Sequence, residues 1–254
     1  MKISVITVSY NSAATIAAAL TSVAEQTWPS VEHILVDGAS TDGTLGIAQL
    51  YGGHLARIVS ERDLGIYDAM NKGLRLATGD VIGFLNSDDV YANQNVLREY
   101  GEAFRNPAVD VCYGDLVYVL KDDLAKIVRH WRSRPYVDGA FASGWVPPHP
   151  TFYARSSVYQ EHGAFDLSMP LAADFELMCR LVHSGVRTQY LPGVKVRMRL
   201  GGATNASLIN IMRQNSEILR AMRLHGVPVG LRYVLGKVSD RVSQFLDKSS
   251  TWTG

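Results

Sequence analysis

The tetrad Asn86-Ser87-Asp88-Asp89 contains the residue types of this chain that are best suited to chemistry. It follows the apolar run Val81–Leu85, which is typical of a buried parallel strand. Two adjacent carboxylates at the exit of such a strand are costly unless a positive charge lies near them. A divalent cation that carries a nucleoside diphosphate would supply that charge. The alternative is a turn or a helix start, where Asp is common.

Polar residues also follow two other predicted strands. Ser9-Tyr10-Asn11 comes after Ile3–Val8, and Asp37-Gly38 comes after His33–Val36. In a doubly wound sheet these strand ends converge with the tetrad on one edge, where ligands of open α/β sheets bind. A carboxylate such as Asp37 could accept hydrogen bonds there from a base or a ribose, although Asp-Gly is also an ordinary turn sequence.

A phosphate-bearing ligand at this edge needs a positive partner. Residues Ser9–Ser12 contain no glycine, and the chain has no Gly-Lys-Ser/Thr phosphate loop. Hard cations prefer carboxylate oxygens, and Mg²⁺ uses one or two carboxylates together with substrate phosphates. Mn²⁺ suits the same oxygen ligands. We therefore expect Asp89, with Asp88 beside it, to supply the cation site.

The second half of the chain offers a possible proton acceptor. Asp174 lies at a predicted helix start, where it either caps the helix or removes a proton from an incoming hydroxyl. Glu176 is a weaker candidate for the same task. His149 lies between two prolines, and a single histidine is more often structural than a ligand. A serine hydrolase has little support, because no Gly-x-Ser-x-Gly elbow occurs.

Strand and helix alternate over the first ninety residues, which predicts an α/β fold with a mostly parallel, doubly wound sheet flanked by helices. The pattern changes after Val90, and residues 121–145 give no clear assignment. The predicted helices are 13–24 (capped by Ser12), 44–50, 66–76, 96–104, 174–183, 206–224 and an amphipathic stretch over 231–245. The predicted strands, besides those above, are 57–60, 109–115, 116–120, 151–154, 188–191 and 194–198.

The composition of the chain limits the kinds of partner and location that we expect. The chain has 254 residues, 47% of them hydrophobic, and a formal net charge of +1, so charge gives no reason to expect nucleic acid. Cys112 and Cys179 each lie in an apolar stretch and are expected to be reduced core residues, with a disulfide between them as the alternative. The first apolar run is too short for a signal peptide, and none approaches the ~18 residues of a membrane span. We expect a soluble or peripheral protein.

Six ordered segments together resemble family 2 glycosyltransferases over roughly residues 1 to 200. Each is weak alone, whereas the ordered set is very specific. The segments are Ile3–Asn11, Val36–Thr44, Gly65–Gly73, Gly79–Asp89, His149–Phe152 and Ala172–Leu177.

The resemblance implies a GT-A fold, a nucleotide-sugar donor, a divalent cation (Mn²⁺ or Mg²⁺) and transfer with inversion at the anomeric carbon. In the family, the residue that matches Asp37 contacts the base, and those that match Asp88 and Asp89 serve ribose and metal, with Asp89 as the metal ligand. The match to Asp174 is the general base. The implied donor-binding residues are Thr7, Ser9, Tyr10, Asp37, Gly38, Asp68, Asn71, Lys72, Asn86 and Asp88. The implied contacts to acceptor or diphosphate are His149 and Glu176.

The resemblance also implies an organisation. We expect one catalytic domain over 1–205, with a nucleotide-sugar-binding half (1–105) and an acceptor half (106–205), followed by a helical tail (206–254). The tail has seven Arg/Lys against three Asp/Glu. Its basic, amphipathic segment 231–245 is compatible with docking to anionic lipid, and packing on the domain or on a second subunit is the alternative.

Two features limit the resemblance. Many relatives carry Asp at the position of Asn86, and the Gln-x-x-Arg-Trp signature of processive synthases is missing, so addition of a single sugar is expected. Small relatives often build bacterial surface polysaccharides on lipid-linked acceptors, so the expected acceptor is a glycan or lipid-linked saccharide. The expected location is the cytoplasm or the cytoplasmic face of the inner membrane. Two rivals remain: a nucleotidyltransferase, which usually has a glycine-rich phosphate loop, and a non-catalytic nucleotide-sugar-binding protein.

Overall fold

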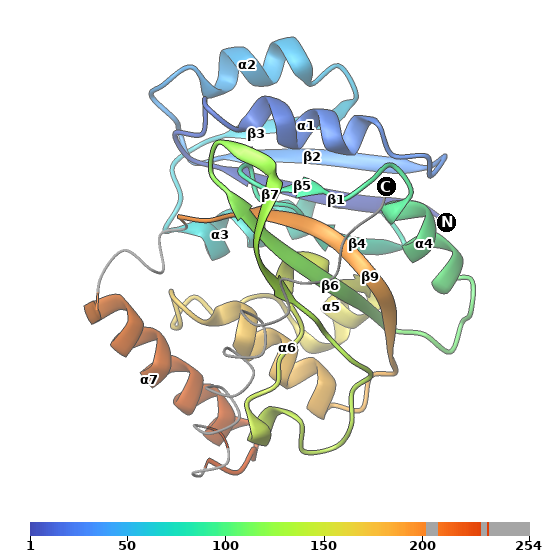
Figure 1. Ribbon diagram of the computed structural model, residues 1–254, viewed down its shortest axis with the longest axis vertical. Helices are drawn as coiled ribbons and strands as arrows, with labels where there is room; N and C mark the ends of the chain where they lie inside the picture. Colours follow the sequence, from blue (N-terminus) through green and yellow to red (C-terminus); the bar gives the residue numbers. More distant parts are fainter. Residues whose placement is uncertain (202–207, 230–232, 234–254) are drawn as a thin grey trace.

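Nine strands form one mixed sheet in the computed structural model, which describes residues 1–201, 208–229 and 233 (Figure 1). The strand order is β3-β2-β1-β4-β8-β6-β9-β5, and β7 pairs with β6. The strands are β1 (Ile3–Ser9), β2 (Val31–Asp37), β3 (Leu55–Ser60), β4 (Val81–Phe84), β5 (Val90–Tyr91), β6 (Val111–Leu120), β7 (Asp123–Trp131), β8 (Tyr153–Arg155) and β9 (Thr188–Arg199). The helices are α1 (Ile16–Ala24), α2 (Thr44–Tyr51), α3 (Ile66–Leu76), α4 (Val96–Ala103), α5 (Ser156–His162), α6 (Ala173–His183) and α7 (Leu208–Leu224), with 3₁₀ turns at Phe141–Ser143 and His149–Thr151.

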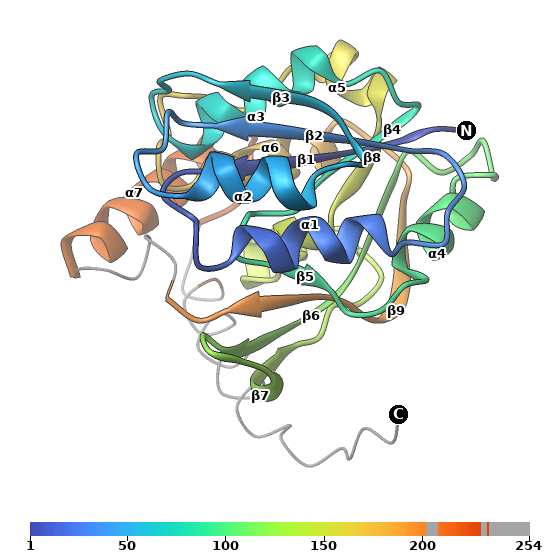
Figure 2. The same cartoon turned by 90° about the horizontal axis from the view of Figure 1, so that it is seen from above.

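The N-terminal half has helices on both faces of parallel strands, as the sequence predicted. β1 pairs in parallel with β2 and β4, and β2 pairs with β3. Ile6 and Ile34 belong to the core shared with α3 and α6, whereas Leu35 packs on the opposite face against α1 and α2 (Figures 1 and 2). Burial of such side chains stabilises the fold by about 1.5–3 kcal/mol each. The parallel register sets Ser9 opposite Asp37, so these strands end side by side.

The second half differs from the prediction in its strands. β8 is antiparallel to both β4 and β6 and so reverses direction in the middle of the sheet. The predicted breaks after Asp115 and Leu191 are wrong, because β6 and β9 each run without a break. The register between them shifts where Pro192-Gly193 is accommodated, which makes this pair a bulge rather than a strand end. The unassigned stretch contains β7, which folds back on β6.

The start of α1 was also predicted wrongly. The helix begins at Ile16 rather than Ala13, and no side chain caps it. The Ser12 hydroxyl instead lies 2.7 Å from the Ser87 hydroxyl, in the loop that follows β4. The residue expected to cap a helix therefore joins two strand ends.

Both cysteines are free and buried, as expected from the sequence. Among the described helices, none is long and apolar enough to cross a membrane. The basic segment 231–245 lies outside the described residues apart from Tyr233, and the expected boundary at 205/206 lies outside them too.

Candidate active site

The loops after β1, β2 and β4 meet at one edge of the sheet. The Ser9 hydroxyl donates to Asp37 Oδ1 over 2.9 Å, which joins the ends of β1 and β2. The contact between Ser12 and Ser87 joins the first loop to the tetrad, and the Ser87 amide donates to the carbonyl of Val8. The structure thus brings together the strand ends that the sequence predicted to converge.

Asp37 is fully buried and organises the second of these loops. Its Oδ1 accepts the hydroxyls of Ser9 and Ser40, and its Oδ2 accepts the Ser40 amide at 2.9 Å and the Ser60 hydroxyl at 2.7 Å. Burial acts to raise the pKa of Asp37, but these hydrogen bonds hold it below its ordinary value. A carboxylate accepts about four hydrogen bonds, and these serine groups supply four. The base contact that the resemblance implies for Asp37 stays a prediction.

The loops after β1 and β2 each contain a residue with an unusual backbone conformation. Asn11 and Ala39 lie in the left-handed region, with φ of 49° and 60°. A Cβ on Gly38 would clash with the end of the Asp63 side chain and meet the ring of Tyr10 at 3.3 Å, so the Asp63 carboxylate would have to move aside for a larger residue. The ring of Tyr10 is 65% exposed beside these strand ends. Sparsely populated backbone conformations of this kind cluster at ligand sites.

The two aspartates of the tetrad lie in different surroundings. Asp89 is fully buried, and burial together with the charge of Asp88 raises the pKa of Asp89 well above that of an ordinary aspartate. Burial also raises the pKa of Asp88, while Arg199 opposes that rise. The Arg199 guanidinium donates a hydrogen bond to the backbone carbonyl of Asp88, so a cation from β9 lies against the tetrad.

Two oxygens of the tetrad are buried without a described hydrogen-bond partner: Oδ1 of Asn86 and Oδ1 of Asp89. The Asn86 amide donates to the other Asp89 oxygen over 3.4 Å. Unpartnered buried acceptors are costly, and both are hard oxygen ligands, so the pair fits a divalent cation. Within residues 1–201, 208–229 and 233, no three His, Cys, Asp or Glu side chains gather as a metal site. Mg²⁺ sites commonly contain fewer, with phosphates and water completing the shell.

Asp174, in the first turn of α6, is fixed by two donors. The Tyr67 hydroxyl of α3 donates to Asp174 Oδ1 over 2.9 Å, and the Phe175 amide donates to the same oxygen over 2.8 Å. Burial, followed by the charge of Asp174, raises the pKa of Tyr67 well above its ordinary value, so the phenol stays protonated and donates. Oδ2 accepts no hydrogen bond from the described residues. The carboxylate is therefore oriented by one oxygen and open at the other.

A group of four rings connects the end of β4 to Asp174. His149 stacks on Phe84 with ring centroids 5.6 Å apart, and Phe165 meets both rings edge-on. Tyr67 stacks on Phe165 at 5.5 Å. Burial lowers the pKa of His149 while Asp174 opposes that shift, and His149 Nε2 is buried without a described partner. His149 Nε2 therefore has no hydrogen-bond partner among the described residues, and His149 lies near enough to Asp174 to feel its charge.

Asn71 and Thr7, both predicted donor contacts, are instead used inside the protein. The Asn71 side chain donates to and accepts from the backbone of Phe165, at 2.9 and 3.0 Å. Thr7 is fully buried, and its hydroxyl lies 2.9 Å from His33 Nε2. In this structure Asn71 positions Phe165 and Thr7 belongs to the sheet interior, and their direct contacts with the donor stay predictions.

Asp68 and Lys72 face each other on α3. Lys72 Nζ lies 3.7 Å from Asp68 and 2.9 Å from Glu61, and it donates to the carbonyl of Arg62. The hydrogen bond with Glu61 raises the pKa of Lys72. Asp68 also accepts the Leu64 amide over 3.0 Å, so both predicted donor residues hold the turn that begins α3.

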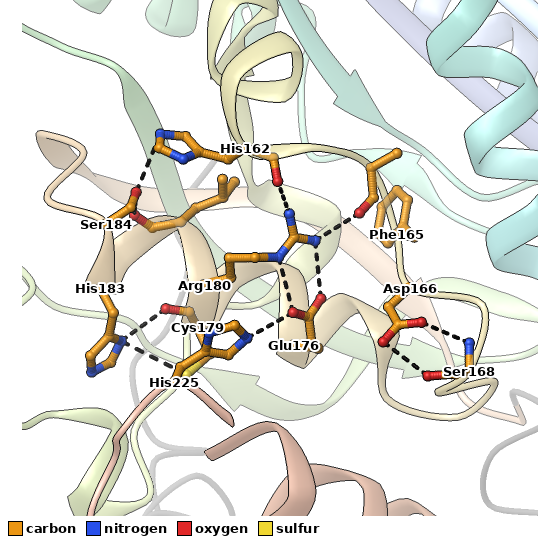
Figure 3. Close-up of polar contacts among 12 residues, drawn as sticks. His162, Phe165, Asp166, Ser168, Glu176, Cys179, Arg180, His183, Ser184 and His225 are labelled. Atoms are coloured by element: carbon orange, nitrogen blue, oxygen red, sulfur yellow. Dashed lines mark hydrogen bonds and ion pairs between the residues drawn. The ribbon is translucent and has the colours of Figure 1, made fainter. Parts of the chain in front are cut away.

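Glu176 is held by other side chains of the protein in this structure. Its buried carboxylate accepts two hydrogen bonds from Arg180, at 2.9 and 3.1 Å, and a contact from His225 Nε2 at 2.7 Å (Figure 3). Arg180 also donates to the carbonyls of His162 and Ala164. Both oxygens of Glu176 are engaged in these contacts, so the structure supports a structural role. Its contact with acceptor or diphosphate stays a prediction.

Sequence reasoning missed two residues of this site. Tyr67 lies inside one of the segments that resemble the family, but an uncharged phenol beside Asp68 gives no sequence signal of a role at the site. Arg199 is 111 residues from its partner Asp88, and its position in a predicted strand end gave no signal. A tyrosine directly before the motif aspartate, as in Tyr67-Asp68, is the sequence signal for this residue in similar chains.

Comparison with known proteins defines the family. Residues 4–161 match glycosyl transferase family 2, and the chain belongs to that family. Over 118 residues the chain is 41% identical to a PGL/p-HBAD biosynthesis glycosyltransferase of Mycobacterium bovis. That match covers 45% of this chain and 46% of the relative, so the chain matches about half of the relative's length.

Solved structures show the same fold. TarS 1-349 of S. aureus in complex with UDP-GlcNAc superposes with a TM-score of 0.67 at 21% identity, over 96% of this chain and 73% of that TarS chain. The mannosyltransferase PcManGT of Pyrobaculum calidifontis, in complex with GDP-Man and Mn²⁺, superposes with a TM-score of 0.65 at 20% identity. The match covers 98% of this chain and 70% of PcManGT. The GT-A fold expected from the sequence is confirmed.

Proposed function

We propose that the protein is an inverting, metal-dependent glycosyltransferase that moves one sugar from a nucleotide-sugar donor to a hydroxyl of a glycan or lipid-linked saccharide. The observation that carries the proposal is the pair of buried, unpartnered oxygens of Asn86 and Asp89 at the end of β4, in a chain of this family. Such a pair is costly without a bound partner, and a cation with a diphosphate is a partner of the right chemistry.

The donor lies across the loops after β1, β2 and β4, in residues 1–105. The exposed ring of Tyr10 stacks on the base, beside the loop that Asp37 organises, and Asp88 faces the ribose. Asp89 and Asn86 would hold the cation, which would supply positive charge to neutralise the negative charge of the departing nucleoside diphosphate. Support comes from the neighbours: TarS binds UDP-GlcNAc, and PcManGT binds GDP-Man with Mn²⁺.

The reaction takes place between this donor and an acceptor bound by residues 106–205. The acceptor oxygen forms a bond to the anomeric carbon as its proton passes to Asp174, and the bond from that carbon to the diphosphate oxygen breaks on the opposite face. The configuration at the carbon is thereby inverted. Tyr67 and the Phe175 amide hold Oδ1, which directs the free Oδ2 toward the acceptor. Orientation of the two substrates supplies much of the remaining rate effect.

Thermal-shift measurements with UDP-, GDP- and dTDP-sugars, with Mn²⁺ or Mg²⁺, test the donor site. A ligand at 100 times its Kd stabilises the folded state by about 2.7 kcal/mol, which for this size is a rise in Tm of roughly 5–11 °C. We expect such a rise for one nucleotide, dependent on the cation and lost in Asp89→Ala. A protein that binds a donor yet transfers to none of a broad acceptor panel would instead be a non-catalytic nucleotide-sugar-binding protein.

A further inference from the structure

We propose that a shallow pocket beside Tyr67 binds an apolar group of the acceptor, an alkyl or aryl aglycone attached to the sugar that carries the reacting hydroxyl. This inference rests on the proposed function and names the substrate class of the same site. The pocket is formed by residues 64–68, at the start of α3, and by Leu167 and Pro170 in the loop before α6. Its empty volume is about 240 Å³.

Three exposed aliphatic residues lie at the rim of this pocket. The side chain of Leu64 is 85% exposed, that of Ile66 is 46% exposed and that of Leu167 is 43% exposed. Single exposed aliphatic residues are normal on protein surfaces, but several that surround one hollow mark a binding site. Gly65 between the first two has a φ of 115°, and a Cβ placed there would meet nothing within 4 Å. The left-handed turn therefore leaves open space above the pocket.

The position of the pocket selects the acceptor as its occupant. Tyr67 lines the pocket, and its hydroxyl donates to Asp174, the proposed base. A group bound against the Tyr67 ring is therefore one side chain away from the atom that takes the proton. A hydroxyl of the sugar joined to that group reaches Asp174 while the apolar group itself covers Leu64 and Leu167.

The charges argue against a phosphate in the same place. Among the described residues that line the pocket, none is positively charged. The one acidic residue, Asp68, accepts the Leu64 amide and lies 3.7 Å from Lys72, which turns it along the helix. A diphosphate belongs instead at the tetrad, where a cation would accompany it.

The size of the pocket indicates that it holds part of a ligand. The volume of about 240 Å³ includes space that is open to solvent, so the hollow encloses far less than a site for a complete small molecule. An aromatic ring or the first few carbons of a chain would occupy it, while the rest of the acceptor extends outward. Each buried methylene strengthens binding by about fourfold.

The test compares hexyl β-D-glucoside with methyl β-D-glucoside, which share a sugar and differ in the apolar group. Binding to the full chain is followed by ligand-observed saturation-transfer NMR, with dissociation constants from titration. We expect the hexyl compound to bind at least about tenfold more tightly, with transfer concentrated on its alkyl protons. The variant Leu64→Ser/Leu167→Ser should lose most of that advantage, and Leu50→Ser, which changes a leucine 77% exposed on α2, should keep it.

Equal binding of the two glucosides, absence of binding by both, or an advantage that survives in the double variant would overturn the inference. Binding of UDP, GDP and dTDP with Mn²⁺ is measured on the same samples. Retained nucleotide binding without the alkyl preference rejects the apolar subsite alone. Failure of all nucleotides to bind rejects the proposed function, whatever the glucosides do.

Discussion

The replacement Glu176→Gln separates a structural carboxylate from a catalytic one. The Glu176 side chain is 5% exposed and holds Arg180, which is 21% exposed, and His225, which is 20% exposed. Removal of one charge from a fully buried pair costs about 3–5 kcal/mol. Because both partners retain some contact with water, we expect about 2–3 kcal/mol here, which corresponds to a fall in Tm of roughly 4–12 °C.

The assay is thermal unfolding, run together with nucleotide binding by calorimetry at a temperature where every variant is folded. Glu102→Gln is the matched control, because Glu102 pairs with Arg105 at 3.0 Å on the surface, with side chains 47% and 68% exposed. A surface pair of this kind contributes about 0–1 kcal/mol, so its Tm should change little. If Glu176→Gln kept the wild-type Tm and lost sugar transfer instead, Glu176 would be a substrate contact and the structural reasoning would be refuted.

Two further predictions concern buried hydrogen bonds. Tyr67→Phe should lower the transfer rate about tenfold with unchanged nucleotide binding, because Asp174 loses the hydrogen-bond donor that orients it. Tyr51→Phe, at a half-exposed position, is the control. An undiminished transfer rate in Tyr67→Phe would contradict the role of Tyr67. Burial, together with His54, lowers the pKa of His33 to about 3. The unfolded chain takes up this proton near its ordinary pKa of 6.5, so the folded state loses up to about 1.4 kcal/mol per pH unit as pH falls from 6.5 toward 3. Urea unfolding across that range should show a shallower loss in His33→Gln; parallel curves for the two proteins would rule the histidine out.

The sequence was sufficient for the fold where local signals agree. Helix α3 has the predicted bounds, and β1 differs by one residue, because the apolar periodicity and the flanking turn residues favour one structure. The bulge at Pro192-Gly193 could not be predicted, since a proline-glycine pair also ends strands and only pairing with β6 decides between the two.

The candidate site was predictable in its residue types and less so in its contacts. Convergence of Asp37 with the tetrad follows from parallel strand ends. The contacts of Asp37 with Ser9 and Ser60, and of Glu176 with His225, depend on long-range packing that no spacing reveals. The pair of Glu176 and Arg180, by contrast, lies four residues apart on one helix, a spacing that the sequence shows. The local sequence identifies a carboxylate that is expected to need a hydrogen-bond or ion-pair partner. Only the fold shows whether residues of the protein already fill that role.

The central claim is that Asp174 removes the acceptor proton while other residues bind the donor. Asp174→Asn tests it most directly, because the amide oxygen still accepts from Tyr67 and Phe175 and the side chain keeps its size. With the nucleotide sugar identified by thermal shift, we expect unchanged donor and Mn²⁺ binding and a transfer rate reduced by about 10²–10⁴-fold, the usual contribution of a general base. A variant that transfers sugar at a near-normal rate would contradict the account.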